Sequence, residues 1–156
     1  MAAKLTVKKV LEEAVEKEVQ SQRLYFHLME KVNDRAVKQG LSDLALQEKK
    51  HQILFEQLLR GEIKGGALGT PKVIDYKIAE YFDAPKLTPD MKLPDIFLLA
   101  ANREKISHDF YLCLGAMYSP GKVKQLLGEV AAQELLHKQI VETLYTEVAF
   151  PQTDGG

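Results

Sequence analysis

The sequence LALQEKKH occupies residues 44–51, and VAAQELLH occupies residues 130–137. In both segments, apolar residues spaced for one face of a helix lead into a glutamate, and a histidine follows it three positions later. A helix places residues i and i+3 on nearly the same face, about 4.5 Å apart along its axis. Each segment therefore predicts an amphipathic helix whose apolar face is interrupted by two side chains suited to bind a metal ion.

Stripes of apolar residues at separations of three and four recur along most of the chain, and strand alternation is absent. Turns are expected at Asn33-Asp34 and at Ser119-Pro120-Gly121, which separate the helices of each pair. The stripes predict four long helices, at about residues 5–32, 35–60, 93–118 and 122–149.

Residues 61–92 are rich in glycine and proline and are expected to form a crossover, within which Val73 to Phe82 can form a short helix. Either helical pair alone would leave its apolar stripe in water, so the pairs are expected to share one core. The prediction is a single all-α domain over residues 1–156, an antiparallel four-helix bundle made of two hairpins and a long crossover.

Composition excludes several classes of function. The chain has 21 basic and 22 acidic residues, so its formal charge of −1 attracts neither nucleic acid nor an anionic membrane. It contains no run of about 20 apolar residues and no signal peptide pattern. Cys113 is the single cysteine, which excludes an internal disulfide and is typical of a reducing compartment. We expect a cytoplasmic protein with Cys113 as apolar filling of the core.

Each apolar stripe is interrupted near its middle by a glutamate where an apolar residue is expected. These glutamates are 30 positions apart within each helical pair, and an offset of 86 carries the first pair onto the second. The same offset relates the two histidines, which indicates an internal duplication. The six candidate ligands are Glu18, Glu48, His51, Glu104, Glu134 and His137.

Charge explains why these residues predict metal. A lone helical glutamate is usually solvated and a lone buried histidine is usually a hydrogen-bonded core residue, but six in register are hard to explain that way. Four carboxylates buried together would repel one another strongly. Two divalent cations would balance their charge, accept both neutral imidazoles and leave positions for water, oxygen or peroxide.

Two tyrosines, Tyr25 and Tyr111, follow Glu18 and Glu104 by seven positions and lie on the same side of their helices. Each suits either apolar filling or a hydrogen bond to a ligand carboxylate on another helix. They are the candidate catalytic residues beyond the metal ligands.

The spacing Glu18 with Tyr25, Glu48-x-x-His51, Glu104 with Tyr111 and Glu134-x-x-His137 resembles the rubrerythrin branch of the ferritin-like di-iron proteins over nearly the whole chain. The resemblance implies a ferritin-like bundle with two iron ions, although manganese and zinc suit the same ligands. It also implies that Glu48 and Glu134 bridge the metals and that the other four residues are terminal ligands.

Two departures from the family pattern affect the expected function. Rubrerythrins proper carry a small rubredoxin domain whose four cysteines hold one iron, whereas this sequence ends at Gly156 with Cys113 alone. Electrons are therefore expected from a separate donor such as a rubredoxin-like protein. Ser107 stands where typical peroxidase rubrerythrins have a further glutamate. The remaining set of four glutamates and two histidines resembles the sites of ferroxidases.

Several functions are therefore open. The resemblance favours reduction of hydrogen peroxide by a di-iron oxidoreductase, with a ferroxidase or iron-handling protein using dioxygen as the alternative. The family's dimanganese relatives leave a catalase-like activity open. A non-enzymatic alternative is a bundle, stabilised by metal, that only binds partners. The resemblance also implies a homodimer.

Overall fold

The computed structural model describes residues 7–62 and 71–149, which contain helices and no strand. The expected start of the first helix near residue 5 and the crossover residues 63–70 lie outside this part of the chain. The chain divides into two compact units, one of residues 1–67 and 120–126, the other of residues 68–119 and 127–156. No helix in the described residues combines the length and the apolar character needed to cross a bilayer.

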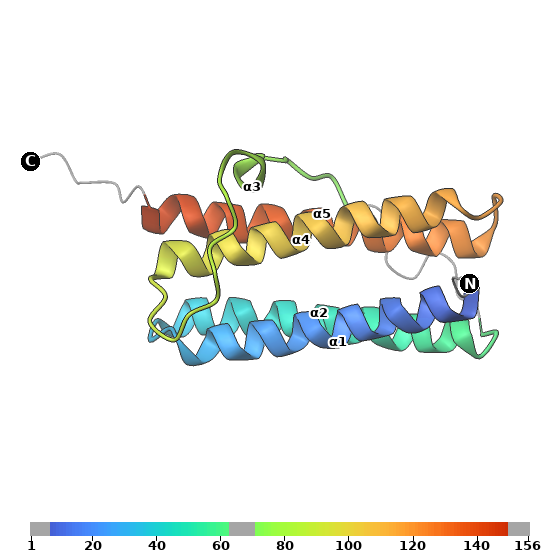
Figure 1. Cartoon of the computed structure of the whole chain (residues 1–156), viewed down its shortest axis with the longest axis horizontal. Helices are drawn as coiled ribbons and strands as arrows, with labels where there is room; N and C mark the ends of the chain where they lie inside the picture. The colour runs from blue at the N-terminus through green and yellow to red at the C-terminus, as the bar shows by residue number, and fades with distance from the viewer. Residues whose placement is uncertain (1–6, 63–70, 150–156) are drawn as a thin grey trace, which may run out of the picture. The chain divides into compact units, whose positions relative to one another are not determined.

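The first unit contains a hairpin of two helices, α1 (Val7–Glu30) and α2 (Arg35–Leu59), which run side by side in Figure 1. Asp34 ends the turn as the N-cap of α2, where its side chain accepts a hydrogen bond of 3.0 Å from the Val37 N–H. The core of the hairpin is apolar and fully buried, with Ala14, Leu28, Leu41 and Phe55 among its members.

A glycine with positive φ ends α2. Gly61 has φ 77°, a conformation that glycine adopts without steric cost, and its N–H donates to the Leu58 carbonyl at 3.1 Å. The next N–H, of Glu62, donates to the Gln57 carbonyl at 2.8 Å. These bonds give carbonyls of the last helical turn donors from beyond the end of the helix.

The second unit contains α3 (Ile78–Tyr81), α4 (Leu93–Ala116) and, from residue 127, the greater part of α5 (Lys122–Ala149). Pro94 lies in the first turn of α4, where a missing N–H costs nothing. The helices α4 and α5 approach closely at Gly115, since a Cβ there would lie 3.6 Å from the Leu127 Cβ. Residues 96–101 are all buried, so more than one face of α4 is covered.

The described part of the crossover, residues 71–92, is largely irregular, and its short helix is α3 rather than the whole of Val73 to Phe82. Lys77, directly before α3, has φ 55°. A residue in this left-handed conformation cannot belong to a right-handed helix, so α3 begins after Lys77 and does not extend back to Val73. We call residues 74–82 the strap. The strap packs within the second unit, where α3 contacts α4 and Phe82 meets the Tyr145 ring of α5 at a centroid distance of 5.9 Å.

Candidate metal centre

In the first unit, three of the predicted ligands lie together and are buried: Glu18 from α1, and Glu48 and His51 from α2. The His51 Nδ1 lies 3.7 Å from the Glu18 Oε1 and 3.7 Å from the Glu48 Oε2. The i, i+3 spacing places Glu48 and His51 on one face of α2, and the hairpin brings Glu18 to them. These three residues are the first triad.

In the second unit, the corresponding residues form the same arrangement. The His137 Nδ1 lies 3.7 Å from the Glu104 Oε1 of α4 and 3.8 Å from the Glu134 Oε2, one turn earlier on α5. All three side chains are buried. These residues are the second triad, and the match between the two triads in composition and spacing supports the duplication seen in the sequence.

The spacing within each triad fits a metal ion. Ligand atoms about 2.1 Å from a metal lie roughly 3.0–3.4 Å from one another. The imidazole–carboxylate separations of 3.7–3.8 Å are slightly wider than this and too long for direct hydrogen bonds. Within each triad, the ligand atoms lie no more than 4.8 Å apart. Buried carboxylate oxygens with an imidazole nitrogen are a donor set suited to iron, manganese or zinc.

The two candidate tyrosines, Tyr25 on α1 and Tyr111 on α4, are both fully buried. Tyr111 meets the neighbouring Phe110 ring edge-on, at a centroid distance of 5.1 Å. This packing agrees with a role in filling the core, while hydrogen bonding to a ligand carboxylate stays a prediction.

Each hairpin is tied together by a polar contact close to its triad. In the first, the Gln22 side chain of α1 donates to the Gln52 Oε1 of α2 at 2.9 Å and to the Glu18 carbonyl at 3.1 Å. In the second, the His108 Nδ1 of α4 lies 2.7 Å from the Ala131 carbonyl of α5. The carbonyl accepts a hydrogen bond from the tautomer that carries its proton on Nδ1. Neither tie was predicted, because a glutamine or histidine beside an apolar stripe resembles any surface residue.

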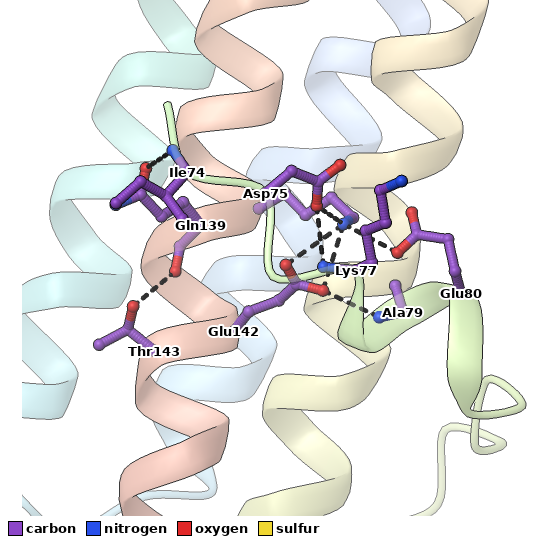
Figure 2. Close-up of polar contacts among 9 residues, drawn as sticks. Ile74, Asp75, Lys77, Ala79, Glu80, Gln139, Glu142 and Thr143 are labelled. Carbon is purple, nitrogen blue, oxygen red and sulfur yellow. Dashed lines mark hydrogen bonds and ion pairs between the residues drawn. The ribbon is translucent and has the colours of Figure 1, made fainter. Parts of the chain in front are cut away.

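A second polar cluster lies in the second unit, where Asp75 and Glu80 of the strap come near Glu142 of α5 (Figure 2). Lys138 is only 1% exposed, and its Nζ donates to the Asp75 Oδ1 at 2.6 Å and to the Glu80 Oε2 at 3.1 Å. Both Glu142 oxygens lie 3.2 Å from the same nitrogen. One ammonium group therefore holds three carboxylates, two from the strap and one from α5.

The cluster shifts the titration of its members. Burial alone would lower the pKa of Lys138, but hydrogen bonds to Asp75 and Glu80 and the charge of Glu142 raise it above its usual value. Burial would likewise raise the pKa of Asp75, and the bond from Lys138 together with the Lys77 N–H lowers it below its usual value. Both groups are therefore charged across the neutral range.

Sequence reasoning missed this cluster. Lys138 and Glu142 form an i, i+4 pair, the spacing of ordinary solvated ion pairs on helix surfaces. The available signal was the position of this pair beside Val141 and Tyr145, which are buried on the same part of α5. The prediction for Cys113 was wrong, since Cys113 is exposed on α4 rather than buried in the core.

The helical hairpins and their carboxylate–histidine triads define the ferritin-like class of all-α proteins, as the sequence predicted. Residues 9–145 match the rubrerythrin family, and the chain belongs to that family. The solved structure of a hypothetical protein from Pyrococcus furiosus is similar in fold, with a TM-score of 0.71 and 24% identity over 96% of this chain and 94% of that one. The search of curated proteins found no match.

Proposed function

We propose that the two triads together hold two iron ions and that the protein is a di-iron oxidoreductase that reduces hydrogen peroxide. The observation that carries this proposal is the doubled, buried Glu–Glu–His triad in a member of the rubrerythrin family. Buried carboxylates need a positive partner, and two divalent cations supply four positive charges for four glutamates. Membership of the family favours iron over the manganese or zinc that the same ligands accept.

The proposed reaction converts one hydrogen peroxide, two electrons and two protons into two molecules of water. The iron pair would supply the two electrons when bound, and a separate donor protein, such as a rubredoxin-like carrier, would restore them. By family resemblance, Glu48 and Glu134 would bridge the two ions, while His51, His137 and the remaining glutamates would be terminal ligands. The burial of both triads limits access of bulk water to the reacting oxygens.

Rapid mixing tests this proposal. Ferrous protein mixed anaerobically with hydrogen peroxide should be oxidised much faster than free ferrous iron, with a rise in the near-ultraviolet absorption of protein-bound ferric iron. The double substitution Glu48→Ala and Glu134→Ala should abolish both iron binding and this reaction. A matched control replaces two exposed glutamates, Glu13→Ala and Glu147→Ala, and should behave as the wild type. Oxidation no faster than that of free iron would contradict the proposal.

A ferroxidase is the second candidate, and Ser107 is the observation that favours it. This serine is buried in α4, three residues after Glu104, where a peroxidase of this family would carry a further carboxylate. The two triads are left with the same composition, as in symmetric ferroxidase sites. Oxidation of many ferrous ions per chain by dioxygen, with mineral retained, would favour this function. Elemental analysis with a test for oxygen evolution distinguishes the dimanganese, catalase-like alternative.

The proposed setting of this chemistry is the cytoplasm, where a single exposed thiol stays reduced and carrier proteins can supply electrons. A homodimer is proposed from the family. If the protein is instead a metal-stabilised interaction bundle, the metal will bind but show no redox reaction with either oxidant.

A further inference from the structure

The strap is attached to α5 through side-chain contacts, and Figure 2 shows Asp75 and Glu80 of the strap near Glu142 of α5. Lys138 holds Asp75 and Glu80 of the strap at 2.6 and 3.1 Å. The strap backbone is bound as well, because Gln139 Oε1 accepts from the Ile74 N–H at 2.9 Å. We call this set of contacts the latch.

Glu142 gives the latch a second function at the start of α3. Its Oε2 accepts a hydrogen bond of 2.8 Å from the Ala79 N–H while both its oxygens contact Lys138. Lys77, the N-cap residue of α3, makes no side-chain cap, so Glu142 on α5 satisfies an N–H at the beginning of that helix. The strap is therefore fixed at its charged side chains and at its backbone.

The strap conformation is one that its own sequence does not favour. Lys77 has φ 55°, which a residue with a Cβ rarely adopts, and its N–H is held by the Asp75 Oδ1 at 3.0 Å. Asp75 thus binds both this strained residue and Lys138. A conformation of this kind persists where surrounding contacts over-determine it, and the latch supplies those contacts.

The latch lies beside the second triad in sequence and on the same helix. His137 and Lys138 are consecutive in α5, and both are buried with partners on different elements: α4 for His137 and the strap for Lys138. A rigid helical turn that carries both residues transmits any shift at one to the other. If the latch opened, this turn of α5 would lose the contacts that hold it on the side of the strap.

We propose that Lys138 is a positioning residue, and that the latch couples closure of the strap to metal binding at the second triad. With the strap closed, the turn of α5 that carries His137 is fixed for coordination; a metal bound there in turn holds the strap closed. Binding linkage requires the two effects to be equal in magnitude. The coupling rests on the proposed metal-binding function, whereas attachment of the strap by the latch is independent of it.

The test combines amide hydrogen exchange of the strap with titration by Co²⁺, whose visible absorption reports coordination. The main variant is Asp75→Asn with Glu80→Gln, which removes the two carboxylate charges that the strap places on Lys138 but leaves Lys138 paired with Glu142, so that α5 keeps a compensated ion pair. Lys138→Met is the second variant. The controls neutralise the same number of charges at exposed residues, with Lys122→Met on α5 and Asp83→Asn with Asp90→Asn on the crossover.

In the metal-free protein, both latch variants should accelerate exchange at the Ile74 and Ala79 amides by on the order of tenfold, while the controls leave it unchanged. In the His51→Ala background, which retains the second triad, opening the latch should weaken Co²⁺ binding by a similar factor. In the His137→Ala background it should have no effect. If the latch had a purely structural role, opening it would weaken Co²⁺ binding in both backgrounds or in neither. Added Co²⁺ should slow exchange of the strap in the wild type.

Each contrary result identifies what fails. Unchanged strap exchange in the latch variants would overturn the latch itself. Faster exchange with unchanged Co²⁺ affinity in the His51→Ala background would overturn the coupling and leave the proposed function intact. Absence of Co²⁺ binding to the wild type would overturn the coupling together with the proposed metal site, while the metal-free exchange data would still decide whether the latch holds the strap.

Discussion

The two helical hairpins have matching triads but different surroundings. The 86-residue offset that relates the triads also carries Gln22 to His108 and Gln52 to Lys138. In the first hairpin, Gln22 and Gln52 bind each other. In the second, His108 turns to a backbone carbonyl and Lys138 turns to the strap. The comparison teaches that the ligands are held constant while the neighbouring position adapts to whatever segment covers it.

The largest expected effect comes from replacing the polar side chain at Lys138, compared with the same replacement at the equivalent position, Gln52. Lys138→Met removes the ammonium group that three carboxylates share, so the free energy of unfolding should fall by about 3–5 kcal/mol. Gln52→Met removes the half-buried hydrogen bond from Gln22 and a long, exposed one of 3.4 Å from Lys49, and should cost about 1 kcal/mol. Chemical denaturation of the metal-free proteins measures both. Equal costs would show that the latch adds no stability beyond an ordinary contact between helices.

The triads should respond alike to neutralisation, which tests their equivalence. Glu48→Gln or Glu134→Gln removes one buried charge, so the metal-free protein should become more stable, by about 1–2 kcal/mol in either hairpin. The same substitutions should lower the gain in melting temperature when metal is added. Destabilisation of the metal-free protein by only one of them would break the comparison between the triads.

The pH dependence of local stability should distinguish the latch from the hydrogen bond between Gln22 and Gln52 in the first hairpin. The pKa of Asp75 is lowered from 3.8 in the folded protein. Its contribution to the free energy of unfolding is therefore present above that value and is lost as the pH falls through the lower, folded-state pKa. The pKa of Lys138 is raised from 10.5, so its contribution is lost only as the pH rises through the higher, folded-state pKa.

Exchange of the Ala79 amide, corrected for intrinsic rates, should therefore be constant from about pH 5 to pH 9 and should increase several-fold below about pH 3.8. Asp75 faces Lys138 and Lys77, and Glu80 and Glu142 share the same ammonium group. Asp75→Asn should remove much of the increase in acid. The side-chain amides of Gln22 and Gln52 do not titrate. A similar increase in backbone amide exchange around these residues in the first hairpin would therefore indicate general acid unfolding instead.

The smallest effects concern the two positions with positive φ among the described residues, Gly61 after α2 and Lys77 before α3. Gly61→Ala should cost about 1 kcal/mol through backbone strain alone, since a Cβ there would contact nothing within 4 Å. Lys77→Gly should gain about 0.5–1 kcal/mol by relieving the same strain. Lys72→Gly, an exposed position where φ is not positive, is the control and should not be stabilising.

Much of the fold and of the candidate site could be predicted from the sequence, because both depend on periodic patterns within single helices. Glu18 and Glu104 interrupt apolar stripes, and a histidine at i+3 marks the other helix of each pair; all of these residues are buried, in two triads. Coordination of two ions by the six residues together stays a prediction.

The latch could not be predicted, because its carboxylates come from a segment without periodicity. Asp75 and Glu80 lie 63 and 58 residues from Lys138. Only the tertiary placement of the strap turns an ordinary i, i+4 pair into a buried cluster. The prediction for Cys113 failed for a different reason. A small, weakly polar residue within a helix suits the core or the surface, and the pattern around it does not decide between them.

Each triad takes all three of its members from one hairpin, and this has a consequence for how such a chain can evolve. The simplest history is that an ancestral gene for a single hairpin, already carrying every type of ligand, was copied in tandem. The segment that joins the copies belongs to neither and was under no demand to coordinate metal. In such a history the joining segment is free to change without loss of a ligand, which agrees with a strap that packs on the second hairpin and contributes to neither triad.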